Sequence, residues 1–429
     1  MAKASISLIS VLYRLMSRLD IVIFGATGFT GQYVVAEMIQ MANKYPEFKW
    51  GVAGRSQEKL EFVMRVVAES TKADVSNVKI IIANIEDEQS LLAMCGQAKV
   101  VVNCCGPYRF YGEPVVKAAI DSKTNYVDVS GEPHFMESMQ LKYDKMAQDA
   151  GVFVVSGCGF DSIPADLGVL YLQDNFGGTL NSVEIYMSGS IPSELYKEAL
   201  RGGIIHYGTW ESLLYGIWNR NELVPIRKQL FRERMPELKP KLVRRLVHLY
   251  EGAWCLPFPG ADAAVVRRTQ RTKRRPAQLA AYIALSAPAA MIVLFIALLV
   301  ALFSTFTWGR RLLLKHPRVF SLGVVSHTGP RAAAAAATSF ELRLVGRGWA
   351  ARDELDDVLD RTVVAKVSGK NPGYGATATA VLLSAITILK EKILMPTPGG
   401  VMTTGIAFGK TNLTKNLIKH GIKFEITDK

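Results

Sequence analysis

Short apolar runs alternate with amphipathic stretches through the first third of the chain. The runs are rich in Val and Ile, as in strands buried on both faces, and they cover 20–24, 49–53, 78–83, 100–103, 125–129 and 152–155. Between them, apolar residues recur at helical spacing in 32–43, 58–69, 90–96, 115–121 and 137–150. Strands separated by helices pair in parallel through right-handed crossovers. The pattern therefore predicts a doubly wound α/β sheet.

A glycine-rich turn follows the first predicted strand. Gly25, Gly28 and Gly31 stand three apart between the apolar run and the first helix. In such a turn the first glycine permits a tight bend, the second lets a pyrophosphate approach the backbone, and the third lets the helix pack on the strand. The turn therefore predicts a dinucleotide site formed by Gly25, Thr27, Gly28, Phe29, Thr30 and Gly31.

The end of the second predicted strand indicates which dinucleotide binds. An acidic residue there would hold the ribose 2′-hydroxyl of NAD, but this strand is followed by Arg55 and Ser56. A guanidinium pairs with a 2′-phosphate, so the sequence favours NADP(H) over NAD(H). The alternative is a solvated arginine in a loop. Asn103 and Gly106, after the fourth strand, are assigned to the nicotinamide half of the same cofactor.

Four residues are candidates for the chemistry. Tyr108 and Tyr111, in the loop expected after the fourth strand, are placed to line the substrate pocket or to donate a proton. Asp161 follows the sixth strand and either carries chemistry or caps the helix expected near Pro164. His206 is either a structural histidine or a residue that faces the substrate.

The overall composition narrows the partners. The 429 residues carry a formal net charge of +13, which indicates anionic partners such as a phosphorylated cofactor or an anionic membrane. The five cysteines form no Cys-x-x-Cys pair, which favours reduced thiols in a cytosol-facing protein. The scattered histidines predict no metal site.

A long uncharged stretch, 276–309, departs from a simple soluble enzyme. Its length permits a transmembrane helix, but basic clusters lie on both sides of it and Pro288 lies within it. We therefore expect a hairpin or re-entrant insertion from one face of a membrane. The alternatives are a buried helix pair and a dimer interface. The basic flanks account for much of the net charge through anionic lipid headgroups, so nucleic acid is not expected as a partner.

Several motifs together resemble one family. They are FGATGFTG, AGRS, NCCGPYRFYGEPVVKAA, YVDVSGE, GFDSIPADLG, GYGATATAVLLSA and GGVMTTGIAFGKT, and the set is similar to the saccharopine dehydrogenase-like oxidoreductases over nearly the whole chain. The resemblance implies an NAD(P)-binding Rossmann domain, 20–170, interrupted by a second α/β domain, 171–370, and completed by returning C-terminal elements, 371–429. Residues 1–19 are then an extension, although their basic, acid-free character would also fit a mitochondrial presequence.

The resemblance also implies a reaction class. Members of this subtype resemble trans-acting enoyl reductases of lipid synthesis, so the chain is expected to transfer hydride between NADP(H) and a lipid-like substrate. A saccharopine substrate would need clustered arginines, which the sequence does not place. The expected location is a lipid droplet or the endoplasmic reticulum, with the mitochondrion as the alternative and a homodimer possible. The competing hypothesis is a membrane-associated scaffold that binds the dinucleotide without turnover.

Overall fold

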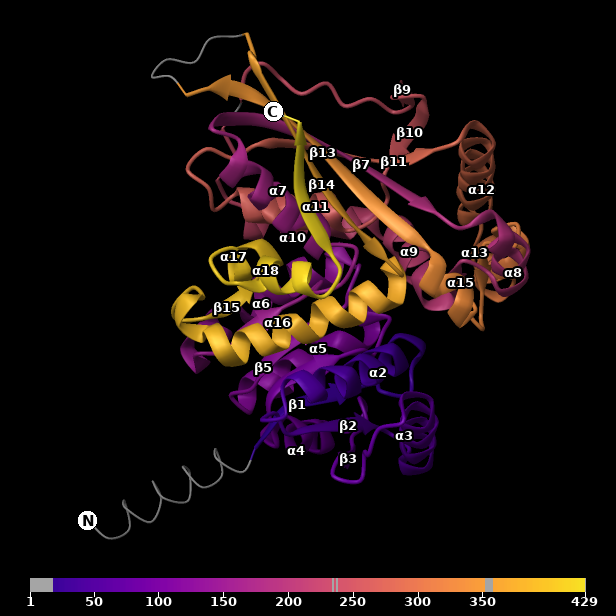
Figure 1. Ribbon diagram of the computed structural model, residues 1–429, viewed down its shortest axis with the longest axis vertical. Helices are drawn as coiled ribbons and strands as arrows, with labels where there is room; N and C mark the ends of the chain where they lie inside the picture. Colours follow the sequence, from indigo (N-terminus) through magenta and orange to yellow (C-terminus); the bar gives the residue numbers. More distant parts are fainter. Residues whose placement is uncertain (1–17, 234, 237, 352–357, 429) are drawn as a thin grey trace.

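The computed structural model describes residues 18–428 apart from 234, 237 and 352–357, and these residues form two seven-stranded sheets (Figure 1). Sheet A is parallel throughout, in the order β15-β6-β5-β4-β1-β2-β3. Its strands are β1 (Leu19–Phe24), β2 (Trp50–Gly54), β3 (Lys79–Ile82), β4 (Ala98–Asn103), β5 (Asn125–Asp128), β6 (Phe153–Val155) and β15 (Gly400–Met402). The predicted doubly wound α/β sheet is confirmed.

Helices cover both faces of sheet A. Alternate residues of β1 point to opposite sides, so that Ile21 and Ile23 belong to one core and Val22 and Phe24 to the other. The first face is covered by α2 (Phe29–Lys44), α3 (Gln57–Thr71) and α16 (Thr377–Glu391), and the second by α4 (Glu88–Gly96), α5 (Tyr108–Asp121) and α6 (Pro133–Ala150).

Helix α5 begins earlier than predicted. The expected helix was 115–121, with Tyr108 and Tyr111 in a loop, but both tyrosines lie in the first turns of α5. Pro114 lies inside the helix. The early start is possible because the carboxylate of Glu132 accepts the first N–H groups of α5, which have no partner within the helix.

Sheet B is mixed and lies on the other side of α16 (Figure 1). Its order is β16-β14-β13-β7-β11-β10-β9, and only β7 and β11 run parallel. The strands are β7 (Gly178–Ser190), β9 (His248–Tyr250), β10 (Ala253–Pro257), β11 (Gln278–Leu285), β13 (Ser339–Ala350), β14 (Arg361–Lys370) and β16 (Lys423–Asp428). The segment 371–429 therefore contributes β15 to sheet A but β16 to sheet B.

The two sheets share one hydrophobic core. It runs from β1 through α16 and α7 (Ile163–Asn175) to Leu342 and Leu344 of sheet B. Three further helices pack around α7 and α16: α11 (Asp262–Gln270), α17 (Thr404–Phe408) and α18 (Leu413–Lys419). Because the core is continuous, the relative position of the two sheets is fixed by packing.

The remaining elements lie beside the two sheets. Among them, β8 (Ile205–His206) and β12 (Val325–Ser326) form a short parallel sheet. The helices are α8 (Tyr196–Gly202), α9 (Tyr207–Trp218), α10 (Leu223–Leu230), α12 (Ala287–Ser304), α13 (Thr307–Lys315), α14 (Pro317–Phe320) and α15 (Ala332–Ala337). Short turns of helix cover Ser193–Leu195, Arg220–Glu222, Pro372–Ala376 and Lys392–Leu394.

The uncharged stretch 276–309 is not one membrane segment. Its first part is strand β11 of sheet B, and the rest is the single helix α12 followed by the start of α13. Pro288 lies in the first turn of α12, where a missing N–H costs nothing, so it does not break the helix. Only 17% of α12 is buried, so the alternative of a buried helix pair is wrong for this helix. By length and composition alone, α12 and the window Pro372–Leu394 are long and apolar enough to cross a membrane.

Candidate functional site

The glycine turn of residues 25–31 has the geometry that a phosphate site needs. Gly25 has a φ of +81°, and a Cβ on it would lie 2.7 Å from the Sγ of Cys105. A Cβ on Gly31 would lie 2.1 Å from the carbonyl oxygen of Gly25, so both glycines are required by packing within the protein. Gly28 is exposed, and a Cβ there would meet nothing closer than 3.2 Å. The open side of the turn is therefore at Gly28.

Helix α2 begins directly after this turn. In the part of the chain that the structure describes, no side chain caps its first N–H groups, which belong to Phe29, Thr30 and Gly31. Uncapped N–H groups at a helix N-terminus attract an anion, and the macrodipole adds to that attraction. Thr27 lies in the same turn, where its carbonyl oxygen accepts a hydrogen bond from Gln32. These residues fit the pyrophosphate of a dinucleotide.

Arg55 lies at the end of β2, with its side chain exposed. Among the described residues, no carboxylate pairs with it, and its charge acts on the thiol of Cys105 beside the glycine turn. The hydroxyl of Ser56 accepts the N–H of Lys59 at 3.4 Å and so caps α3. The guanidinium of Arg55 is therefore available to a 2′-phosphate, whereas the Ser56 hydroxyl already has a structural partner.

Asn103 and Tyr108 shape the loop after β4 from within. The Asn103 amide donates to the hydroxyl of Tyr126 at 3.0 Å, and its oxygen accepts the N–H of Cys105 at 3.0 Å. The hydroxyl of Tyr108 donates to the carbonyl of Asn103 at 2.8 Å, and burial raises the pKa of Tyr108 well above its ordinary value. These contacts argue against Tyr108 as a proton donor and against direct cofactor contact by the Asn103 side chain. Gly106 is exposed at the tip of the loop.

The cysteines of this loop, Cys104 and Cys105, are packing residues. All five cysteines of the chain are free. Burial raises the pKa of the Cys105 thiol to about 12, and burial also raises the pKa of Cys104. A protonated, buried thiol is a poor nucleophile, so the chemistry of the site lies elsewhere.

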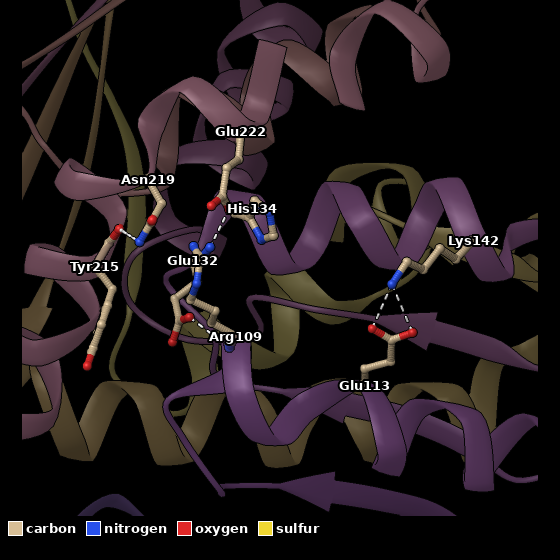
Figure 2. A network of polar contacts seen from close by, with 8 residues as sticks. All are labelled: Arg109, Glu113, Glu132, His134, Lys142, Tyr215, Asn219 and Glu222. Carbon is tan, nitrogen blue, oxygen red and sulfur yellow. Dashed lines mark hydrogen bonds and ion pairs between the residues drawn. The ribbon is translucent and has the colours of Figure 1, made fainter. Parts of the chain in front are cut away.

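Glu132 holds the start of α5 against α9. Its carboxylate accepts the N–H groups of Tyr108 and Arg109, both at 2.9 Å, and the hydroxyl of Ser212 at 2.8 Å. Figure 2 shows the contact with Arg109. The sequence analysis did not select Glu132. The available signal was its place in SGEP directly before a helix, where a carboxylate commonly satisfies free N–H groups.

Ion pairs fix the inserted helices on sheet A. Arg109 pairs with Glu222, which also lies 3.1 Å from Nε2 of His134 (Figure 2). On helix α6, the buried carboxylate of Glu137 binds Arg227 of α10 through two contacts of 2.8 Å. Charge-assisted pairs of this geometry are stronger than neutral hydrogen bonds, so α9 and α10 are held in one position above α5 and α6.

His206 is a structural residue. Its Nδ1 accepts the N–H of Gly208 at 3.1 Å and caps α9, and its ring stacks on Phe29 at 4.6 Å between centroids. Burial lowers the pKa of His206, while a hydrogen bond to the backbone of His327 opposes this. These contacts give His206 a structural role, and the expectation that it faces the substrate stays a prediction.

Two ionisable residues beside His206, Tyr207 and His327, were not selected from the sequence. The exposed ring of His327 stacks on Tyr207 at 4.3 Å between centroids, and burial together with Glu211 raises the pKa of Tyr207 to about 12. These residues come together because β8 pairs with β12. Helix α9 reaches from the glycine turn to Glu132, since its N-cap His206 stacks on Phe29 and its Ser212 binds Glu132. Two-residue strands leave no periodic signal, so the sequence could not place Tyr207 and His327 together.

Asp161 does not cap α7. The N-cap residue is Ser162, without a side-chain bond, while the carboxylate of Asp161 faces Gly131 across the carboxyl edge of sheet A. A Cβ on Gly131 would lie 2.9 Å from the Asp161 Oδ2. Burial raises the pKa of Asp161 to about 6. The nearby Asp262 has a pKa well above its ordinary value, because of burial first and the charge of Asp161 second.

Tyr111 differs from the other candidates because it is exposed on α5, with 43% of its surface accessible. Its ring contacts Phe110 at 6.2 Å between centroids. No acid or base of the described residues contacts its hydroxyl. The position does not mark Tyr111 as a proton donor.

The glycine turn, the free N-terminus of α2 and Arg55 together define the NADP-binding domain of an oxidoreductase. Residues 21–155 match the family model described as the saccharopine dehydrogenase NADP binding domain. The human protein named saccharopine dehydrogenase-like oxidoreductase is 40% identical over 421 residues, which cover 95% of this chain and 96% of the human one. The chain belongs to this family, and the expected preference for NADP(H) is confirmed.

Two further comparisons extend this result. A Caenorhabditis elegans protein named lipid droplet localized protein is 38% identical, over 96% of this chain and 99% of the worm one. The solved structure of apo saccharopine dehydrogenase (L-Glu forming) from Saccharomyces cerevisiae has a TM-score of 0.52 and 15% identity, over 95% of this chain and all of that one. This second likeness shows a common fold.

Proposed function

We propose that this oxidoreductase acts on a lipid-like substrate while docked on a lipid surface through α12. One observation carries the proposal: the exposed apolar helix packs against α9, whose N-cap residue His206 stacks on Phe29 of the glycine turn. Val300 of α12 packs in one cluster with Trp210 and Leu214 of α9 and with Leu313 of α13. The first residue of α9, Tyr207, packs against this same cluster. A lipid surface at α12 would therefore lie next to the elements that cover the cofactor.

Different residues around the glycine turn would contact different parts of the dinucleotide. The N–H groups at the start of α2 would hold the pyrophosphate beside Gly28, and Arg55 would hold the 2′-phosphate. The loops after β4, β5 and β6 lie at the carboxyl edge of sheet A, where the nicotinamide half binds in this type of fold. When bound, the nicotinamide supplies or accepts the hydride.

Asp161 is the residue that we assign to proton transfer. Reduction of a C=O, C=C or C=N group by hydride leaves one position that must receive a proton. Asp161 lies at the carboxyl edge of sheet A, is partly exposed, and titrates at a pKa of about 6 because of burial. Its carboxyl group can donate the proton and recover it from solvent.

The outer face of α12 fits a lipid surface. The large side chains that it exposes are all apolar: Met291, Ile292, Val293, Leu294, Phe295, Leu298 and Leu302. The helix α13 that follows carries Arg310, Arg311 and Lys315, which suit anionic headgroups. Sheet B contains strands from before α12 and from after it, so both ends of α12 face the same compartment. Helix α12 therefore lies in the interface rather than crossing the membrane, as a lipid droplet or the endoplasmic reticulum would allow.

The experiment is NADPH oxidation by the full chain in the presence of vesicles made from fractionated lipid extracts. Turnover is expected with at least one lipid fraction and none without lipid. The Gly28→Val variant is the control, since its branched side chain occupies the place of the pyrophosphate. If the wild-type chain binds NADPH and the vesicles but oxidises no NADPH with any fraction, the chain is a dinucleotide-binding scaffold and the proposed activity is wrong.

A further inference from the structure

A row of aromatic side chains connects α12 with the start of α5. The ring of Tyr111 contacts Phe110, with 6.2 Å between centroids, and Phe110 contacts Tyr215 of α9 edge to face at 5.0 Å. Tyr215 in turn contacts Trp218 edge to face at 5.3 Å. The four rings, here called the aromatic row, thus form an unbroken chain of contacts across two helices. Figure 2 shows Tyr215 on α9 beside the first turn of α5.

One end of the aromatic row reaches the apolar helix. Trp218 donates its indole N–H to the hydroxyl of Ser304, the last residue of α12, at 2.7 Å. The turn that follows exposes Phe306 and Trp308, whose rings stack at 5.4 Å. Aromatic residues, tryptophan above all, are enriched where a protein meets the headgroup level of a membrane. This end of the row therefore lies at the proposed lipid surface.

The other end reaches the loop on the nicotinamide side of sheet A. The N–H of Phe110 donates to the carbonyl of Pro107 at 3.1 Å, so Phe110 directly follows the loop after β4. That same loop packs its Cys105 against Gly25 of the cofactor turn. The row therefore runs from the lipid side of the molecule to the place where the reaction would occur.

The rings of the aromatic row are exposed to solvent in part. Phe110 is 47% exposed and Tyr111 43% exposed, and Tyr215 and Trp218 are partly exposed. Single exposed apolar residues are common on protein surfaces, but contiguous apolar surface usually marks a binding site. A linear aliphatic chain suits such a surface, because rings in a line offer apolar contact along its whole length.

We propose that the aromatic row binds the aliphatic tail of the substrate, so that a lipid enters from the surface at α12 and its reactive head reaches the loops of sheet A. This inference rests on the proposed function and specifies its substrate class: an amphiphile with a long linear tail and a reducible group at or near its head. The continuity of the row with α12 favours a lipid tail over a second copy of the chain.

The test is binding of cis-parinaric acid, a linear fluorescent fatty acid, to the full chain without vesicles. Wild-type protein is expected to bind the probe, and Phe110→Ala and Tyr215→Ala are expected to weaken binding at least tenfold each. Phe110→Leu keeps an apolar side chain and is expected to restore most of the affinity. The matched control is Phe62→Ala, which removes an equally exposed phenylalanine from α3, away from the row, and is expected to change nothing.

Two parallel measurements separate this inference from the proposed function. NADPH affinity and vesicle flotation of each row variant are expected to equal those of the wild type, since neither depends on Phe110 or Tyr215. If these two properties hold in the wild type but the probe fails to bind, or binds the Ala variants equally well, the aromatic row is not a tail site. If the wild type sediments as a dimer that Phe110→Ala converts to monomer, the row is an interface between copies and the proposal is overturned.

Discussion

Two apolar helices of this chain pass the same test of length and composition for crossing a membrane, yet they have opposite surroundings. The window Pro372–Leu394, which contains α16, is 78% buried between the two sheets, whereas α12 is 17% buried. Figure 1 shows α16 running through the middle of the molecule and α12 standing at its side. Apolar composition alone therefore does not decide where a helix lies.

The difference lies in the small and hydroxylated residues of α16. Thr379 donates to Glu37 at 2.9 Å and Ser384 donates to the carbonyl of Ala380 at 2.8 Å, so these two buried hydroxyls have partners in the protein. Small side chains such as Ala378 and Ala385 let α16 lie close to its neighbours. Helix α12 instead carries bulky apolar residues around its whole circumference, and one side of the protein cannot cover them all.

Each helix supports one half of the proposed reaction. Thr377 of α16 accepts the N–H of Phe160 at 3.1 Å and thereby holds the loop that carries Asp161. Helix α12 supports α9 through the bond between Ser304 and Trp218. We therefore expect substitutions on the α16 side to change stability and cofactor binding, and substitutions on the α12 side to change lipid binding.

The largest effect is expected for a charge placed in α16. Leu382 is fully buried, so Leu382→Arg would bury an unpaired guanidinium and cost more than about 4 kcal/mol of unfolding free energy. Soluble yield and thermal unfolding measure this. A Leu382→Arg protein that melts with the wild type would mean that α16 is not the core helix described above.

The same substitution in α12 is expected to leave the fold intact. Leu294 is 45% exposed, so Leu294→Arg is expected to change the unfolding free energy by less than about 0.5 kcal/mol. It is expected to weaken vesicle binding by about 1.5–3 kcal/mol, or roughly tenfold to a hundredfold, in a flotation assay, because the apolar contact of one leucine with the lipid is lost.

The two positions serve as matched controls for one another. Leu294→Ala keeps an uncharged side chain and is expected to retain most of the vesicle binding that Leu294→Arg loses. Unfolding of Leu294→Arg, or a change in its oligomeric state, would show that α12 is covered by protein rather than by lipid.

The elements that the sequence predicted well are those with a local signal. The strands β1 to β6 coincide with the predicted apolar runs, and the glycine turn is visible in its spacing. The three-residue strand β15 is too short for such a pattern. Pro288 was misread because a proline marks either the first turn of a helix or a break within it, and the residues on both sides are equally apolar.

The candidate site was harder to predict than the fold, because tertiary contacts set the role of each polar residue. His206 and Tyr108 were selected by type, but their polar atoms are bound within the protein. Glu132 and His327 were not selected, because their roles depend on α5 and on β8, which are distant in sequence. Side chains are interpreted correctly only once their partners are known.

The next effect concerns the pH dependence of stability on the α16 side. Burial raises the pKa of Asp161 from 3.8 to about 6, so the folded state holds this proton more tightly than the unfolded chain does. The contribution of Asp161 to stability therefore falls as pH rises from about 4 to 6, and the full penalty is present above that range. Asp161→Asn is expected to unfold at nearly the wild-type midpoint at pH 4 and to be about 2 kcal/mol more stable at pH 8.

Denaturant titrations at the two pH values measure this difference. Asp174→Asn, which neutralises an exposed carboxylate at the end of helix α7, is the control and is expected to show no such pH dependence. An Asp161→Asn gain that is equal at pH 4 and pH 8 would show that ionisation of Asp161 carries no penalty in the folded protein.

The smallest effect, and the most specific one, is expected for Arg55→Ala. Only NADPH carries the 2′-phosphate. Loss of the guanidinium is therefore expected to weaken the binding of NADPH at least tenfold, or about 1.4 kcal/mol, and to leave the binding of NADH nearly unchanged. Fluorescence titration with both cofactors measures the ratio, and Arg65→Ala on the adjacent helix α3 is the charge-matched control. Vesicle binding of Arg55→Ala is expected to equal that of the wild type, because Arg55 lies on sheet A and the lipid face lies on α12. Equal losses for NADPH and NADH would mean that Arg55 supports the turn without contacting the phosphate, and weaker vesicle binding would mean that the two halves of the molecule are coupled.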